Sequence, residues 1–250
     1  SKIGSITVQQ NKWTKDGYIT RRLPEKEGQL FDIVELEKDV LDFNRYNEGV
    51  RLSANLKAGE KPGTTDIEVV ADENFPFHVM GIMDNAGRYN TGSIRGGAML
   101  YADSLFGHRD RMSLGSYFSK GAQSPFADYN FPVNKKDGRI GFTYSSTFAK
   151  VKYGPYANLF DLRSAGSQYS LYYSQPLVRK PGFELKSYVA ANYKRARTDI
   201  GIKGTDDGAH SIDNVTSLEA ALQMRKDTKY GIWYLNQDAY YAIPIFNSDR

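Results

Sequence analysis

Cysteine is absent from the 250 residues of this chain, and long apolar runs are absent as well. Without thiols the chain cannot form disulfides, thiolate zinc sites, iron–sulfur clusters or a cysteine nucleophile. The longest purely apolar stretches are only a few residues, as at Tyr240–Ile243, whereas a membrane-spanning helix needs roughly 18 to 20 residues. The sequence therefore excludes much enzyme chemistry and the class of helical membrane proteins.

A large excess of one charge is missing too. Lys and Arg number 33 against 29 Asp and Glu, which gives a net charge of +4, and the two signs are interspersed. So small an excess gives no reason to expect a nucleic-acid partner. The mean hydropathy of -0.56 resembles that of an ordinary soluble protein. The chain begins with Ser1 and shows no signal sequence, so we expect a processed start or a fragment.

The patterns that carry catalysis or hold metals are also missing. His78, His108 and His210 are far apart and lack metal-ligand spacing. Neither a Gly-x-Ser-x-Gly nucleophile elbow nor a phosphate-binding Gly-x-x-x-x-Gly-Lys occurs. The carboxylates of Gly204–Gly208 could hold calcium, but the spacing of an EF-hand is absent, which favours a mobile surface loop. We therefore expect no enzymatic activity, no cofactor and no metal site.

What the sequence does contain is a heavy aromatic load and many glycines, with 18 Tyr, 13 Phe and 23 Gly. Residues 1 to about 74 have the pattern of a small α/β module. Alternation predicts a strand around 3–8, and Asp16 can cap a brief helix around 18–23. Asp32 and Glu35 form a capping pair for a longer helix, with apolar residues at helical spacing, namely Ile33, Leu36, Val40, Leu41 and Phe43.

Two further strands complete this module, because 50–56 and 67–71 alternate on either side of a turn that contains Pro62 and Gly63. The expected order is therefore strand, helix, helix, strand, strand. We expect the inward-facing Leu36, Val40, Leu52 and Leu56 to form its core.

From Phe75 onward the helical period gives way to alternation of apolar and polar residues. Ile140, Phe142 and Tyr144 fall on one face of a strand, and Arg139 and Thr143 fall on the other. The pattern predicts about nine strands, over 76–86, 92–103, 110–120, 126–134, 139–150, 166–178, 182–198, 214–226 and 230–246.

The connections between these strands alternate between tight turns and longer loops rich in Gly and Asp. Short turns at one end, long loops at the other and strands of ten or more residues are typical of a transmembrane β-barrel. A soluble β-sandwich or jelly roll alternates as well, but its strands are usually nearer five or six residues. The small polar residues on the opposite faces suit a water-filled lumen.

Several stretches resemble one family of outer-membrane proteins. Ala58–Val69 resembles its proline-glycine turn and following strand, and Met83–Gly87 with Thr91 and Gly92 is similar to the junction of its first two barrel strands. Asp103–Asp110 resembles its first periplasmic turn, from which His108 and Arg109 depart, and Gln175–Leu177 resembles a strand end. In order and spacing, the chain resembles the two-partner secretion transporters, the haemolysin secretion/activation proteins of the Omp85 superfamily.

This resemblance implies a fold and a division into domains. Residues 1–74 would be an α+β POTRA module (β-α-α-β-β), the second of two, and 75–250 the N-terminal part of an outer-membrane antiparallel β-barrel. Nine strands would be the first of an expected sixteen. Because an open sheet edge has no partners in hydrocarbon, we expect the chain to be incomplete.

The resemblance also implies a function. The protein would be a transporter that secretes a large partner exoprotein (of haemolysin, adhesin or contact-dependent toxin type) from periplasm to cell surface without nucleotide hydrolysis. Its expected partners are an exoprotein client bearing an N-terminal secretion domain and outer-membrane lipid, with no nucleic acid and a monomeric state. The expected location is the bacterial outer membrane, with the POTRA module in the periplasm. Two alternatives are a barrel-assembly factor of the same superfamily and a soluble β-rich carbohydrate-binding protein.

Two sets of candidate site residues follow. An extended client could add to an open edge of the POTRA module by β-augmentation, and the expected edge strand consists of Val50, Arg51, Leu52, Ser53, Ala54, Asn55 and Leu56. The alternation places a set of charged residues on the lumen side of the barrel, namely Arg139, Glu184, Lys186, Lys194, Glu219 and Arg225.

Overall fold

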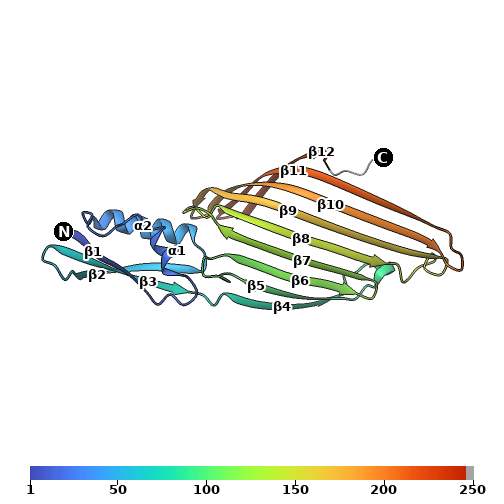
Figure 1. Ribbon diagram of the computed structural model, residues 1–250, viewed down its shortest axis with the longest axis horizontal. Helices are drawn as coiled ribbons and strands as arrows, with labels where there is room; N and C mark the ends of the chain where they lie inside the picture. The colour runs from blue at the N-terminus through green and yellow to red at the C-terminus, as the bar shows by residue number, and fades with distance from the viewer. Residues whose placement is uncertain (246–250) are drawn as a thin grey trace.

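The computed structural model describes residues 1–245 and contains two β-sheets, of three and nine strands. The three-stranded sheet and two helices come from the first 73 residues, and the nine-stranded sheet spans residues 77–243. Figure 1 shows the small sheet at one end of the strands of the large one, with α1 and α2 on one side of it. The first part of the chain is called the N-terminal module below.

The N-terminal module contains, in order, β1 (Lys2–Gln9), α1 (Asp16–Thr20), α2 (Ile33–Tyr46), β2 (Val50–Ala58) and β3 (Thr64–Glu73). Its sheet has the order β1-β3-β2, with β1 parallel and β2 antiparallel to β3. The Asp32 carboxylate caps α2 by accepting from the backbone N–H of Val34 at 2.8 Å, which satisfies one of the donors that a helix start leaves free. Among residues 1–245, no helix is long and apolar enough to span a membrane.

The core of the module lies between the helices and the sheet. It contains eleven buried apolar residues, Ile3, Tyr18, Ile19, Leu23, Leu36, Phe43, Val50, Leu52, Ile67, Val69 and Ala71. Val40 packs against this core, as expected. Leu56 does not belong to it, because 40% of its surface is exposed. It lies toward the end of β2, past the part of the strand that the helices cover, so the expectation for this residue was wrong.

Nine antiparallel strands form the large sheet, each paired with its neighbours in sequence. This confirms the predicted number of strands and their antiparallel arrangement. Their bounds are β4 Phe77–Asp84, β5 Arg95–Ala102, β6 Arg111–Ser119, β7 Ala122–Pro132, β8 Arg139–Lys150, β9 Phe160–Lys180, β10 Phe183–Ile202, β11 Gly208–Thr228 and β12 Gly231–Ile243. A single turn of 3-10 helix, η1 (Tyr89–Thr91), lies in the loop between β4 and β5.

The strands lengthen along the chain, from 8 residues in β4 to 21 in β9 and β11. The extra length comes from segments that were expected to be loops, such as 160–163 and 208–213, whose backbones continue the ladder. β7 also begins earlier than expected. Its Pro125 has no N–H to give, and the ladder to β8 has no pairs at 124 and 125. The last position of the expected strand 230–246 lies outside the described residues.

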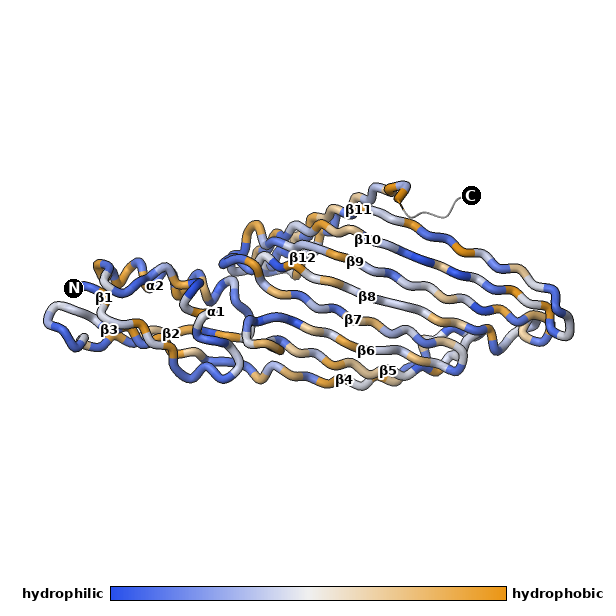
Figure 2. The backbone as a smooth tube through the Cα atoms, viewed as in Figure 1, coloured by the Kyte–Doolittle hydropathy of each residue, from blue (hydrophilic) through white to orange (hydrophobic). Residues whose placement is uncertain are grey.

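The two faces of the large sheet differ in chemistry, as the alternation predicts. Large apolar side chains occupy one face and remain exposed, among them Val79, Met83, Leu100, Leu114, Phe118, Phe131, Ile140, Phe142, Phe148, Leu171, Val189, Leu218 and Leu222. We call this the apolar face. Figure 2 shows the resulting alternation of hydrophilic and hydrophobic positions along the strands.

Candidate functional site

The predicted client-binding strand is an edge strand. Among residues 1–245, β2 pairs with β3 and with no other strand, so its other side is an open edge. Val50 and Leu52 turn their side chains into the core, with 0% and 4% of their surface exposed, whereas Arg51, Ser53 and Asn55 are exposed. The two sets alternate as in a half-buried strand. The structure thus places all seven predicted residues along one edge, and their contact with a client stays a prediction.

Part of this edge is already occupied by a side chain from α2. The Asn44 carboxamide accepts from the Leu52 N–H at 2.7 Å and donates to the Leu52 carbonyl oxygen at 2.9 Å. It therefore pairs with Leu52 in the way that a residue of a neighbouring strand would. Because the backbone groups of alternate residues point to the same side in an antiparallel pair, the next outward-pointing residues are Ala54, Leu56 and Ala58. The available edge is the half of β2 farther from the large sheet.

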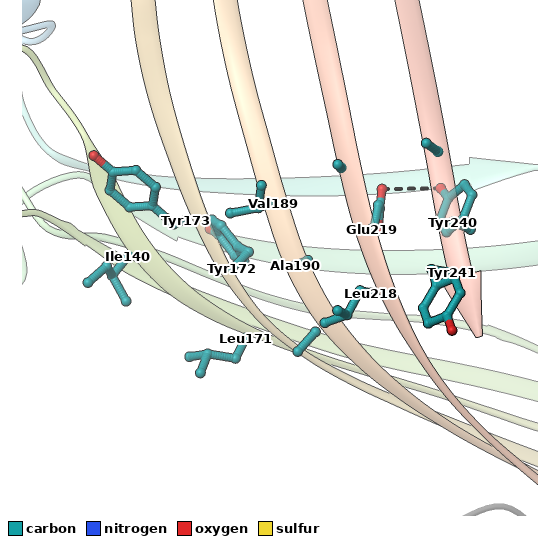
Figure 3. Close-up of a pocket in the computed structure, with 13 residues that line it drawn as sticks. Ile140, Leu171, Tyr172, Tyr173, Val189, Ala190, Leu218, Glu219, Tyr240 and Tyr241 are labelled. Carbon is teal, nitrogen blue, oxygen red and sulfur yellow. Dashed lines mark hydrogen bonds between the residues drawn. The ribbon is translucent and has the colours of Figure 1, made fainter. Parts of the chain in front are cut away.

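The second face of the large sheet carries hydrogen bonds between side chains of different strands, and we call it the polar face. The Tyr172 hydroxyl donates to Asp128 at 2.9 Å, across β8. Asn192 accepts from Ser170 at 2.5 Å and donates to Glu219 at 2.9 Å. Glu219 also accepts from Tyr240 at 3.1 Å, the bond drawn in Figure 3. Neighbouring strands from β9 to β12 are thereby connected through their side chains.

A cavity of about 310 Å³ on the polar face is lined by residues from six strands, five of which contribute charged side chains. Its walls come from β6, β8, β9, β10, β11 and β12, which a flat sheet could not bring together, so the polar face is the inner side of the curved sheet in Figure 1. Four of the six predicted lumen residues line this cavity, namely Arg139, Glu184, Lys186 and Arg225.

The other two predicted lumen residues lie farther along the strands. Glu219 is on the polar face, hydrogen-bonded as described above. Lys194 pairs with Gln168 of β9 and Val215 of β11 and is exposed. By register it shares the face of Asn192, two residues away. All six residues therefore lie on one face of the sheet. Four of them are clustered around the cavity, and Glu219 and Lys194 stand apart from it. Their role in lining a lumen stays a prediction.

Arg139 is the centre of a buried ion-pair network at the module end of the polar face. Its guanidinium lies 2.7 Å from Asp137, 2.6 Å from the Asn130 side chain and 2.7 Å from the Arg109 carbonyl oxygen. Both Arg139 and Asp137 are only 7% exposed. Arg179 reaches the other Asp137 oxygen at 3.6 Å and Glu184 at 2.7 Å. The charges are thus paired on several sides, as burial requires.

The N-terminal module contacts the large sheet at the short turns. Lys15 donates its backbone N–H to Gly107 at 2.9 Å, and Ser104 donates to the Trp13 carbonyl at 2.7 Å, both in the β5–β6 turn. Arg22 reaches the Asn134 carbonyl in the β7–β8 turn at 3.3 Å. The module therefore contacts successive turns at the same end of the sheet, and the long loops lie at the other end (Figure 1).

Arg109 joins the two parts most closely. Its guanidinium donates to the Glu48 carbonyl at 3.1 Å, and its backbone has a φ of 55°, a region that favours glycine. Burial lowers the pKa of Arg109, and the nearby Tyr18 and Asp103 oppose this shift. Burial also raises the pKa of the Tyr18 phenol, whose hydroxyl donates to Asn47 at 2.5 Å. The junction is thus a packed polar interface.

The next feature is the arrangement of groups that could bind a metal ion. Within residues 1–245, no three His, Asp or Glu side chains come together in a way that could hold a metal ion. His108 lies in the β5–β6 turn, with its ring 3.5 Å from the Lys15 amine. The 204–208 segment is exposed and follows β10, with Gly208 as the first residue of β11.

Most of the chain matches the profile of one protein family. The family profile described as haemolysin secretion/activation protein ShlB/FhaC/HecB matches residues 63–250. The chain belongs to this family. The match begins just before β3 and covers the whole large sheet, which is the part with the apolar and polar faces. A search of curated protein sequences found no match.

Three solved structures are similar in fold to this member of the ShlB/FhaC/HecB family. CdiB from Escherichia coli is similar with a TM-score of 0.65 at 17% identity, over 100% of this chain and 46% of that one. CdiB from Acinetobacter baumannii gives 0.67 at 16% identity, over 97% and 46%. BamA from Haemophilus ducreyi, lacking POTRA domains 1-3, gives 0.52 at 10%, over 96% and 55%. The chain thus spans about half the length of these structures, and the likeness is one of fold.

Sequence reasoning missed the junction of this ShlB/FhaC/HecB family chain. Arg109 was noted only as a departure from the expected turn motif, which has glycine at that position. Its positive φ explains why glycine suits the turn, and its bond to Glu48 gives a reason for arginine here. Asp110 is buried, and it accepts from the Phe106 N–H at 3.1 Å. The sequence shows only that two charged residues, Arg109 and Asp110, stand side by side in a turn. This pattern does not reveal that Arg109 contacts Glu48, about sixty residues away.

Proposed function

We propose that this chain is part of an outer-membrane transporter that secretes a large exoprotein from the periplasm to the cell surface by two-partner secretion. The observation that carries the proposal is the family match over 63–250. In this proposal residues 1–74 are a POTRA module in the periplasm, and 75–250 are the N-terminal part of the β-barrel. Transport proceeds without nucleotide hydrolysis, as a monomer.

The arrangement of turns and loops supports this orientation. The N-terminal module contacts the short turns, and in transmembrane barrels the short turns lie on the periplasmic side (Figure 1). The long loops at the far end would then face the cell surface. The exposed apolar face supports contact with lipid, because an apolar surface of this extent would be unusual on a soluble monomer. This also argues against a soluble carbohydrate-binding protein.

The polar face supports a hydrated path for the client. Its charged groups would line the lumen, where water solvates them at small cost, and the cluster around Arg139 and Glu184 lies at the module end, where a client would enter. Both positive and negative side chains line this cavity, so an unfolded client of either net charge meets groups of opposite charge there.

The edge of β2 supports a docking site for the client. An extended segment of the exoprotein's N-terminal secretion domain would add to the sheet beside Ala54, Leu56 and Ala58, where backbone groups point outward. Leu56, exposed at this edge, would give such a segment an apolar contact. Asn44 limits the register, because it already occupies the position beside Leu52.

The proposal is tested by secretion of an exoprotein through the full-length transporter. The protein and the large exoprotein encoded beside its gene are co-expressed in a Gram-negative host, and exoprotein on the surface is measured by protease accessibility. We expect surface exoprotein only with the transporter present. If the exoprotein stays in the periplasm while other outer-membrane barrels lose their assembly on deletion of the transporter, a barrel-assembly factor is the better description.

The docking site is tested by a matched pair of variants at one position. Ala54→Pro removes the outward N–H of the edge, which an edge strand tolerates, whereas Ala54→Val keeps it. We expect a tenfold or larger loss of secretion for Ala54→Pro and near-normal secretion for Ala54→Val, at equal amounts of transporter in the membrane. Equal secretion by both variants would place the client elsewhere.

A further inference from the structure

A row of tyrosines crosses the apolar face. Tyr144, Tyr169 and Tyr193 lie directly opposite one another on β8, β9 and β10. Their ring centroids are 5.1 Å and 6.4 Å apart. Rows of aromatic residues mark the membrane–water interface of transmembrane barrels, because one end of the ring is apolar and the other is polar. On the module side of the row the face is apolar, with Phe142 and Leu171 as the next residues.

Beyond the tyrosines, on the side of the long loops, the same face becomes basic. The register places Arg195 opposite Ser167, Arg197 opposite Ala165, and Lys150 opposite Arg163. Every second residue of a strand shares a face, so these cations point to the same side as the tyrosines. With a rise of about 3.3 Å per residue they lie roughly 7 to 20 Å past the row, measured along the strands.

Five cations border one groove of about 660 Å³ at this place, namely Lys120, Lys150, Lys152, Arg163 and Arg197. We call them the basic cluster. Two carboxylates accompany them. Asp161 lies 3.1 Å from Lys150 and 2.6 Å from Arg163, and Asp199 lies 3.0 Å from Arg197.

The acidic neighbours leave the basic cluster with an excess of positive charge. Five cations share two carboxylates, and in the described part of the chain neither Lys120 nor Lys152 has a carboxylate within 4.0 Å. The arginines are accessible, since the side chains of Arg163 and Arg197 are 58% and 54% exposed. An anion with more than one charge would be attracted to this surface.

The groove also has apolar walls, and these decide between a free anion and a lipid. Phe148 and Ala165 line it together with the cations and, by register, belong to the apolar face. A ligand that fills the groove therefore meets charges at the loop end and an apolar surface that continues toward the tyrosine row. An amphipathic molecule fits both, whereas inorganic phosphate would use only the charges.

We propose that the basic cluster binds the phosphate groups of a lipid in the outer leaflet, a lipid with more than one phosphate such as the diphosphoryl lipid A part of lipopolysaccharide. The choice of leaflet rests on the proposed function, which places the long loops outside. The phosphates contact Lys120, Lys152 and Arg163, and the acyl chains lie along Phe148 and Ala165 and continue over the tyrosine row along the apolar face. The site is thus a lipid-binding surface on the outside of the barrel, separate from the client's path.

The test is lipid binding by the full-length protein in a zwitterionic detergent, measured by native mass spectrometry with diphosphoryl lipid A as the probe. The variant Lys120→Gln, Lys152→Gln, Arg163→Gln removes three charges from the cluster. The control Lys135→Gln, Lys136→Gln, Lys180→Gln removes three charges from turns at the module end. We expect at least tenfold weaker binding for the first variant and less than twofold change for the control.

Two further measurements separate the possible outcomes. A large excess of inorganic phosphate should displace little lipid A, and dephosphorylated lipid A should bind at least tenfold more weakly. Equal binding by the two triple variants, or displacement of lipid A by inorganic phosphate at comparable concentration, would overturn the proposal. Secretion is measured in parallel. If the unaltered transporter secretes normally but the cluster variant binds lipid A as well as the control does, only the lipid site is refuted. If the unaltered transporter does not secrete, the proposed function is refuted.

Discussion

Single residues near the boundary between the two sheets make contacts that their positions in the sequence do not reveal. Arg139 was predicted from alternation alone to lie on the polar face, and it does. Alternation could not reveal that it is buried, because its partners Asp137, Asn130 and Arg109 come from three different segments. The face to which the Arg139 side chain points was predicted correctly, because it follows from the alternation within one strand. Its partners were not predicted, because they depend on the register between strands that are distant in sequence.

Arg139→Met should destabilise the protein by roughly 3 kcal/mol, because it leaves the buried Asp137 with only the more distant Arg179. The double variant Asp137→Asn, Arg139→Met removes both charges and should lose less than the single variant. Urea unfolding of the full-length protein in detergent measures both. If the double variant is less stable than the single one, the loss of the Asp137–Arg139 ion pair itself, and not the unpaired charge of Asp137, accounts for the lower stability.

The Glu25 carboxyl gives the N-terminal module a dependence on pH. Burial raises its pKa above the ordinary value, and the nearby Asp39 and Glu35 raise it further. Because the folded pKa is the higher one, the stabilisation that comes from protonation is present in acid and is lost as the pH rises through the folded pKa. Glu25→Gln should therefore stabilise the module at pH 7 and have little effect at pH 4. Hydrogen exchange of 19–46 at the two pH values checks this, with the exposed Glu27→Gln as control.

Whole elements were predicted well where a pattern of apolar residues defined them. β8 was predicted from 139 to 150 and occupies that range, because Ile140, Phe142 and Tyr144 mark every second position in its first half. On the loop side, β9 and β11 begin six residues earlier than predicted, and β10 ends four residues later. These outer parts are held by backbone pairing between the strands, which the apolar pattern of one strand does not record. The open edge of β2 was expected, but its partial occupation by Asn44 requires the spatial position of α2.

Asn44→Ala should free the backbone of Leu52 and lengthen the open edge of β2. Two hydrogen bonds are lost, so we expect the module to lose about 1 to 3 kcal/mol. The Leu52 amide should exchange with solvent at least tenfold faster, which hydrogen exchange with NMR or mass spectrometry can measure. Asn55→Ala, at an exposed position of the same strand, is the control. Unchanged exchange at Leu52 would show that the carboxamide does not cover this edge in solution.

The two faces of the large sheet should respond oppositely to a new charge. Phe142→Arg puts a guanidinium on the apolar face and should cost roughly 2–4 kcal/mol if that face meets the middle of the membrane. Ser145→Arg puts the same group on the polar face, where water can solvate it. Folding of the full-length protein into lipid vesicles, followed by protease protection, compares the two. Similar folding yields would contradict the assignment of the apolar face to lipid.

At the scale of the whole molecule, the contact between the N-terminal module and the large sheet fixes their relative orientation. The sequence predicted two parts but could not predict that the β5–β6, β7–β8 and β9–β10 turns all contact the first part. Arg109, Arg22 and Arg179 each bridge from one part to a backbone carbonyl of the other. Such contacts join residues more than sixty positions apart, and no local pattern records them.

Gly49→Ala should loosen this orientation. A Cβ at Gly49 would lie 1.9 Å from an Arg109 nitrogen, and the φ of 79° disfavours any side chain. We expect Arg109 to leave the Glu48 carbonyl and the linker around 74–76 to become more accessible to protease, by roughly tenfold. Gly63→Ala is the matched control, because it has a similar φ of 80° but open space around it and lies far from the junction. Equal protease sensitivity of both variants would mean that Gly49 does not secure the contact.

The lengths of β9, β10 and β11 have a consequence for how a cell carrying this protein is recognised. From Tyr193 to Ile202, β10 continues for nine residues past the tyrosine row, which is about 30 Å along the strand. In the proposed orientation, the hairpin of β10 and β11 stands well above the lipid headgroups. An antibody or a bacteriophage approaching through surface polysaccharide would therefore reach 203–207 before any other connection of the described strands, and immunisation with this hairpin is a direct route to reagents that label intact cells.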